Sequence, residues 1–178
     1  MLLDLTHIRQ AETRADRTIA PEAFEGRDNA FRVTAPVDLR LVVHKDGHRY
    51  RLVGRVRASL ELGCSRCLEP FAFEVDASFD LRYLPQAEGE DTGEHELADD
   101  DLTAVFYRDE TIDLVQLVEE QCYLALPMKP LCRPDCKGLC PQCGTNLNAE
   151  TCGCDVRWED PRLAGLKALI TDRNNDDA

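Results

Sequence analysis

Residues 50–83 read YRLVGRVRASLELGCSRCLEPFAFEVDASFDLRY, and this stretch decides the fold. Up to Leu62 the apolar residues fall on even positions, and from Phe71 onward they fall on odd positions. Side chains alternate between the two faces of a strand, so a period of two predicts two strands with one face on a core and the other in water. The connection between them contains Cys64 and Cys67, and we expect it to be a loop that presents ligands.

A third stretch of the same kind lies upstream, where FRVTAPVDLRLVV (31–43) is apolar at every odd position. The link HKDGH joins it to the next strand and contains Asp46-Gly47, a tight-turn signal. The three stretches together predict an antiparallel meander. Pro36 removes a hydrogen-bond donor, so we expect the first strand to lie at an edge or to bulge there. Strands of this length are often broken in two.

Downstream of the meander, residues 86–101 read QAEGEDTGEHELADDD. Repulsion between like charges and the lack of large apolar groups predict an acidic linker or loop that does not pack. A short strand over 102–107 is expected after it. A helix then follows, with Asp113 as N-cap, Gln116 completing a capping box and Pro127 ending it. Cys122 lies within this helix, where we expect a small buried side chain.

The C-terminal region adds a second helix, because Asp160 and Pro161 form a strong start signal before an apolar stripe. The predicted fold class is α+β: an antiparallel β-meander sheet with packing helices and a cysteine-rich zinc module. We expect residues 1–85 to form the β domain with its C-x-x-C loop, and 86–101 the acidic linker or loop. Residues 102–178 would hold the first helix, the zinc module and the C-terminal helix, packed on the same core.

The charge of the chain is concentrated in one segment. The formal net charge is −13, but residues 88–120 alone hold thirteen acidic side chains and one arginine. Residues 1–87 hold thirteen of each sign, so basic faces remain compatible with the overall charge. The N-terminus has no signal-peptide pattern, and no segment is apolar enough to span a membrane. We therefore expect a cytoplasmic protein with reduced thiols and no small-molecule substrate.

Six of the nine cysteines fall in LCRPDCKGLCPQCGTNLNAETCGC (131–154). A C-x-x-C turn directs two thiolates to one point, and CGC supplies two more nine residues later. Four sulfurs form the closed tetrahedral site that structural zinc prefers. The predicted structural zinc ligands are Cys140, Cys143, Cys152 and Cys154.

The remaining clustered cysteines allow more than one arrangement. A second site could consist of Cys64, Cys67, Cys132 and Cys136 and would join the sheet to the C-terminal segment. Alternatively, Cys132 and Cys136 could join the CPQC motif, leaving CGC to pair with the upstream loop. Cys64 and Cys67 could also be free thiols. A thiol-redox centre is a rival hypothesis, but neither C-x-x-C lies in the strand-to-helix context typical of such motifs.

Several motifs together are more specific than any one of them. They are C-x-R-C between two strands (Cys64, Arg66, Cys67), then LALPMKPLC, CKGLCPQCGTNLN with CGC, and DPRLAGLKAL. This combination resembles the YceD family, the large ribosomal RNA subunit accumulation proteins. The resemblance implies a cytoplasmic, non-enzymatic protein needed for accumulation of 23S ribosomal RNA and linked to assembly of the large ribosomal subunit.

A binding face can be read from the second strand, whose outward residues include Arg49, Arg51, Arg55 and Arg57. An arginine stripe can pair with phosphates, which makes these four residues the candidate contacts to RNA. The alternative is a solvated face on which Glu74, Asp76 and Asp80 of the third strand neutralise the stripe. No aromatic residues interleave the arginines, so stacking of single-stranded bases is not predicted.

The family resemblance, taken with the arginine stripe, implies an accessory protein that binds 23S ribosomal RNA or a large-subunit ribosomal protein. The alternatives are an acidic protein–protein adaptor without RNA contact and a thiol-redox protein. We do not expect an enzyme, because a zinc ion held by four sulfurs has no open position for water. Which RNA segment or protein is bound, the mechanism and the oligomeric state do not follow from the sequence.

Overall fold

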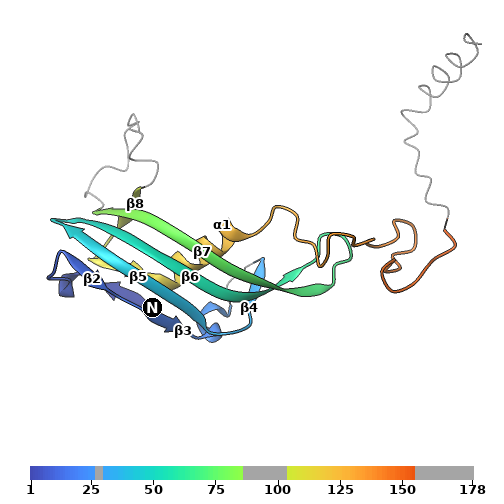
Figure 1. Cartoon of the computed structure of the whole chain (residues 1–178), viewed down its shortest axis with the longest axis horizontal. Coiled ribbons are helices and arrows are strands. Elements are labelled where there is room, and N and C mark those ends of the chain that lie inside the picture. Colours follow the sequence, from blue (N-terminus) through green and yellow to red (C-terminus); the bar gives the residue numbers. More distant parts are fainter. Residues whose placement is uncertain (27–29, 86–103, 155–178) are drawn as a thin grey trace, which may run out of the picture.

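The computed structural model describes residues 1–26, 30–85 and 104–154. It is an α+β fold of mostly antiparallel strands with one α-helix, as predicted (Figure 1). The strands are β1 (Leu2–Asp4), β2 (Glu12–Arg14), β3 (Arg17–Ile19), β4 (Phe31–Val33), β5 (Val37–Asp46), β6 (Arg49–Gly63), β7 (Pro70–Pro85), β8 (Ala104–Tyr107) and β9 (Thr111–Asp113). The helix is α1 (Leu114–Ala125), and two 3-10 turns, η1 (Leu5–His7) and η2 (Pro21–Phe24), complete the list.

The main sheet has the strand order β2-β5-β6-β7-β8, with β3 also pairing with β5 and β4 with β6. The meander β5-β6-β7 is antiparallel as expected, whereas β8 runs parallel to β7. The first predicted strand is broken into β4 and β5, and Pro36 lies in the gap between them. β5 is not an edge strand, because β2 and β3 cover its outer side, whereas β4 pairs with β6 alone among the described strands. Strands β1 to β3 have three residues each, too few to show an alternating pattern.

One face of the sheet forms the core. Leu52, Val56 and Leu60 of β6 are fully buried there, and α1 contacts β6 and β7 from this side. Gly54 lies on the same face, directly opposite Phe79 of β7. A Cβ atom at position 54 would come within 2.6 Å of the Phe79 ring and would also clash with the Arg40 carbonyl. The glycine is therefore required for the aromatic ring to cover the sheet.

Helix α1 begins and ends where the sequence predicts. Asp113 is the N-cap, and its side chain accepts a 2.9 Å hydrogen bond from the Val115 amide. The Gln116 side chain, predicted to complete a capping box, donates a 3.0 Å hydrogen bond to Glu120. Cys122 is fully buried, and burial raises the pKa of its thiol to about 11. It is a core side chain, as expected.

Some predictions fall on residues that the structure does not describe. The acidic segment 86–101 and the C-terminal helix from Asp160 lie outside the described residues, as do the first two residues of the strand expected over 102–107. The division into 1–85, 86–101 and 102–178 stays a prediction. Among the described residues, no helix is long and apolar enough to cross a membrane.

Candidate metal centres and the open sheet face

The two C-x-x-C motifs form the same backbone turn. In the first, the Cys64 amide donates to the Glu69 carbonyl (2.9 Å), and the Leu68 amide donates to the Cys64 carbonyl (2.9 Å). In the second, Cys140 donates to Thr145 (2.8 Å), and Gly144 donates to Cys140 (2.9 Å). The residue after the second cysteine is left-handed in both turns, with φ of 63° at Leu68 and 75° at Gly144. Each turn therefore presents its two sulfurs in the same way.

The first cluster joins distant parts of the chain. Cys64 and Cys67, from the β6–β7 connection, meet two cysteines that follow α1 in sequence (Figure 1). Hydrogen bonds link the same segments, since the Ser65 amide donates to the Pro130 carbonyl (2.8 Å) and the Arg66 guanidinium to the Cys136 carbonyl (2.8 Å). We call this group the bridging cluster; its members are Cys64, Cys67, Cys132 and Cys136.

The second cluster is local in sequence. We call it the local cluster; it consists of Cys140, Cys143, Cys152 and Cys154. Of these cysteines, Cys140 is buried, Cys143 is exposed, and the last two are intermediate. The structure thus brings together the four cysteines that the CPQCG motif and CGC predicted as one site, and it collects the remaining four in the other. The alternative pairing of CGC with the upstream loop is not formed.

Both clusters have a geometry that fits zinc. Within each, all four sulfur atoms lie within 4.8 Å of one another. In the bridging cluster, the Sγ atoms of Cys64 and Cys136 are 3.8 Å apart, and those of Cys67 and Cys132 are 3.7 Å apart. A tetrahedral zinc ion with bonds of about 2.3 Å separates its sulfur ligands by about 3.8 Å, whereas a disulfide needs about 2.05 Å. The bridging cluster is therefore spaced for a metal ion and not for disulfides.

Hydrogen bonds to sulfur favour the thiolate form that a metal requires. Amide groups, first that of Cys132, lower the pKa of Cys64 to about 6. The Thr145 hydroxyl and amide lower the pKa of Cys143 to about 6. The Asn148 side-chain amide donates to the Cys136 sulfur at 3.3 Å. Such outer contacts orient ligands and hold their charge, so each cluster contains a sulfur prepared to bind a cation near neutral pH.

The open face of the sheet, opposite the core, has the arginine stripe and its carboxylate partners. Arg51 donates two hydrogen bonds to Asp80 (2.8 and 2.5 Å), and Arg55 pairs with Asp76. Arg57 lies 3.4 Å from Asp76. These contacts lower the pKa of Asp76 and Asp80, first through the hydrogen bonds from Arg55 and Arg51, so both carboxylates stay charged. Three arginines of the stripe are thus paired with two carboxylates of the third strand, which leaves one positive charge because Arg55 and Arg57 share Asp76.

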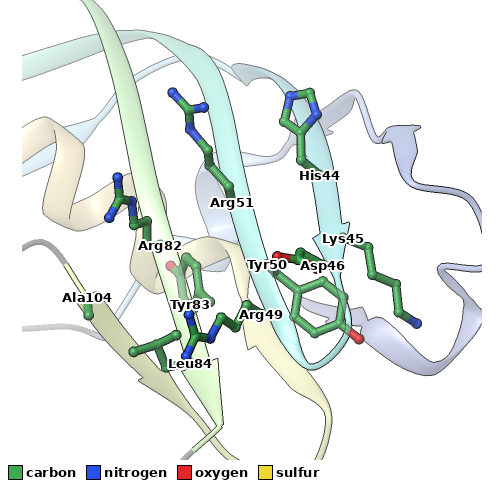
Figure 2. Close-up of a pocket in the computed structure, with 10 residues that line it drawn as sticks. All are labelled: His44, Lys45, Asp46, Arg49, Tyr50, Arg51, Arg82, Tyr83, Leu84 and Ala104. Carbon is green, nitrogen blue, oxygen red and sulfur yellow. The ribbon is translucent and has the colours of Figure 1, made fainter. Parts of the chain in front are cut away.

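Arg49 has no carboxylate partner among the residues that the structure describes, and it lines a hollow beside the β5–β6 turn. We call this cavity of about 400 Å³ the hairpin-end hollow. Figure 2 shows Arg51 and Arg82 on neighbouring strands with their side chains toward the same side. The charged and histidine residues that line the hairpin-end hollow are basic except for Asp46; they are His44, Lys45, Asp46, Arg49, Arg51 and Arg82. The alternating pattern of a single strand does not single out Arg82, because only the register between β6 and β7 places it opposite Arg51.

Comparison with known proteins gives one family. The family model described as "Large ribosomal RNA subunit accumulation protein YceD" matches residues 52–170. An uncharacterized protein of Mycobacterium tuberculosis is 37% identical over 137 residues, which is 76% of this chain and 63% of the relative.

Two relatives in plants have names that describe a role. The protein "Large ribosomal RNA subunit accumulation protein YCED homolog 1, chloroplastic" of Zea mays is 31% identical over 157 residues, 75% of this chain and 52% of the relative. The Arabidopsis thaliana protein of the same name is 29% identical over 156 residues, 75% of this chain and 48% of the relative. The chain therefore spans about half the length of the plant relatives. No solved structure gives a significant match.

Proposed function

Because this chain belongs to the YceD family of large ribosomal RNA subunit accumulation proteins, we propose that it is an accessory protein for 23S ribosomal RNA accumulation and large-subunit assembly. The observation that carries the proposal is the family match over residues 52–170, which includes β7, α1 and both cysteine clusters. Within that role we propose binding to RNA.

The cysteine clusters support a structural and non-enzymatic role for zinc. Each offers four sulfur ligands, and a zinc ion held by four thiolates has no open position for a water or substrate. When bound, the metal would supply a cross-link between segments. A thiol-redox function is the weaker hypothesis, because the sulfur spacing in the bridging cluster is that of metal ligands.

Contact with RNA is best supported at the hairpin-end hollow. An arginine that is already paired with a carboxylate offers less net attraction to a phosphate than one without such a partner. Arg55 and Arg57 share Asp76 and Arg51 pairs with Asp80, whereas Arg49 has no carboxylate partner among the described residues and lines the hairpin-end hollow. A guanidinium group can bind phosphate oxygens with two parallel hydrogen bonds. Of the four candidate RNA contacts in the stripe, the proposal therefore favours the end near the β5–β6 turn, where Arg49 lies.

The second candidate is binding to a ribosomal protein without RNA contact, as an acidic adaptor. Pairing of three of the four stripe arginines with Asp76 and Asp80 favours it. The two candidates differ in their dependence on salt, because phosphate contacts release counterions.

The test measures binding of transcribed 23S ribosomal RNA across salt concentrations. Arg49→Gln removes the one charge of the stripe that has no carboxylate partner among the described residues, and Arg55→Gln removes a paired charge from the same strand outside the hollow. Each lost contact to duplex-like RNA reduces the log–log salt slope by about 0.9, so the first variant should be shallower by about 1. The control variant should retain the wild-type slope. Equal slopes in both variants would exclude the hollow, and absence of RNA binding would favour the adaptor.

A further inference from the structure

The outer edge of β7 is the longest open strand edge in the described part of the chain. One side of β7 pairs with β6 from Pro70 to Tyr83, whereas the other side pairs with β8 only from Arg82 to Pro85. Between these ends, no strand of the described residues pairs with the outer side over 71–81. Figure 1 shows β7 along the border of the sheet, with β8 at one end of it.

Hydrogen bonds identify which backbone groups point outward. The Thr34 amide donates to the Ser59 carbonyl (2.9 Å), so the backbone of Ser59 points toward β4. Glu74 is the partner of Ser59 on β7, and its N–H and C=O therefore point away from β6. This direction alternates along the strand. The outward donors and acceptors belong to Ala72, Glu74, Asp76, Ser78 and Asp80.

This edge lacks most of the devices that protect edge strands. The β6–β7 register runs without a bulge from Tyr50–Tyr83 to Gly63–Pro70, and the prolines of β7 lie only at its two ends. No lysine projects from it. Natural proteins shield free edges with bulges, prolines, lysines or covering segments, so a long regular edge is suited to accept another strand.

The side chains along the edge define what that strand would carry. On the core side, the half-buried residues Phe71, Phe73, Ala77 and Leu81 form an apolar row. On the open face, the same length of β7 has three carboxylates and no basic side chain; they are Glu74, Asp76 and Asp80. Asp76 and Asp80 also pair with arginines of β6, so a basic strand on the outer side would share them, whereas Glu74 accepts from the Ser59 hydroxyl and has no basic partner among the described residues. A second copy paired antiparallel would place carboxylates opposite carboxylates, which is unfavourable. The complementary strand alternates basic and apolar residues.

We propose that the outer edge of β7 is the docking site for an extended segment of a basic protein partner, which adds a strand to the sheet. Main-chain hydrogen bonds to the five outward residues would provide affinity. Alternating apolar and basic side chains would provide specificity. This surface lies outside the hairpin-end hollow and goes beyond RNA binding, so either proposal can fail without the other.

The first test is hydrogen exchange of the free protein. The amides of Ala72, Glu74, Asp76, Ser78 and Asp80 should exchange quickly, whereas those of the intervening residues, which bond to β6, should exchange slowly. Slow exchange at all nine positions from Ala72 to Asp80 would mean that the edge is already covered, and it would overturn the proposal.

The second test adds a peptide of nine residues that alternates lysine and valine. It should slow exchange at the five outward amides, whereas a peptide of the same composition in blocks, or one alternating glutamate and valine, should not. Ser78→Pro removes an outward donor and leaves the β6 ladder intact, and it should weaken binding at least tenfold. Ser78→Ala is the matched control and should bind like wild type.

Ala72→Pro repeats the test near the other end of the edge, in case Ser78→Pro does not fold. Neither proline changes the charge of the protein, so purely electrostatic attachment of the peptide would survive both substitutions. Binding that tolerates both proline variants, or protection of the five amides by RNA and not by the alternating peptide, would overturn the proposal.

Discussion

The bridging cluster and the local cluster use the same turn for different purposes. Both begin with a C-x-x-C whose first cysteine makes the same pair of backbone hydrogen bonds. The bridging cluster then takes its other two sulfurs from residues beyond α1, with 64 residues between Cys67 and Cys132. The local cluster takes its own from a short loop, with eight residues between Cys143 and Cys152.

The difference shows how one ligand motif can serve either tertiary or local structure. On the chain-entropy relation for cross-links, closing a loop of about 65 residues costs roughly 4 kcal/mol, and closing one of about nine costs roughly 2.6 kcal/mol. The longer closure is assisted by the sheet and α1, which already place both ends near each other. The bridging cluster therefore depends on the folded sheet and helix, and it cross-links the segments that they bring together. The local cluster orders only its own loop.

The largest expected effect is the difference between removing one cysteine from the bridging cluster and removing one from the local cluster. Cys136→Ser and Cys143→Ser should each lower zinc content from two ions per chain to one, because a three-sulfur site binds the metal less tightly. Only Cys136→Ser should release the cysteine segment from the sheet, with rapid hydrogen exchange at Ser65 and Leu139, whose amides donate to Pro130 and Arg66.

In Cys143→Ser, these two bridging amides should stay protected, and faster exchange should be confined to Cys140 and Gly144 within the local turn. Elemental analysis and exchange measured on the same samples check both statements. Equal loosening of the two regions in both variants would show that the clusters form one cooperative unit, and wild-type protein without metal would remove the basis of the comparison.

A smaller effect is expected from two glycines with the same backbone angle. Gly138 and Gly144 both have φ of 75°, but a Cβ at 138 would lie 3.0 Å from the Arg66 carbonyl, and one at 144 would meet nothing within 4 Å. A left-handed alanine costs roughly 1–2 kcal/mol, so Gly144→Ala should lose about 1 kcal/mol. Gly138→Ala should lose about 2 kcal/mol, because the bridging contact must also shift. Urea unfolding at fixed free zinc measures both, and equal losses would contradict the prediction.

Periodicity in the sequence predicted the meander, α1 and the buried state of Cys122 because each depends on local pattern. The alternation over 50–83 reaches from one end of β6 to the end of the meander, and Asp113 caps its helix through its own neighbours. The switch of the apolar residues from even positions in β6 to odd positions in β7 also placed Asp76 and Asp80 on the same face as the arginines. The ion pairs there follow from that placement.

The cysteine pairing, the parallel strand β8 and the hairpin-end hollow depend on contacts between segments that no local pattern specifies. The choice among cysteine pairings was open because all sulfurs have the same chemistry, and the docking of Pro130 and Leu139 on the β6–β7 loop decides it. The parallel pairing of β8 likewise depends on where the chain returns after residue 103. The hairpin-end hollow needs the register of β6 and β7, which joins Arg51 to Arg82.

The smallest effect concerns the left-handed position, at which the two turns have different residues. Leu68 occupies the left-handed site that Gly144 occupies in the other turn, and its side chain is 71% exposed. The left-handed conformation costs a leucine roughly 1–2 kcal/mol, and glycine avoids this cost. Glycine also increases the entropy of the unfolded chain, which opposes the gain by about 0.4–1 kcal/mol.

Leu68→Gly should therefore stabilise the protein by about 0.5–1 kcal/mol, since little buried surface is lost with an exposed side chain. Leu68→Ala is the matched control: it removes the same exposed side chain but keeps the strained backbone, so its stability should stay close to that of wild type. Urea unfolding of the zinc-loaded proteins distinguishes the two. If Leu68→Gly were instead destabilising while Leu68→Ala was neutral, the bridging turn would not carry the strain that its φ of 63° indicates. The equivalence of the two turns would then hold for their hydrogen bonds alone.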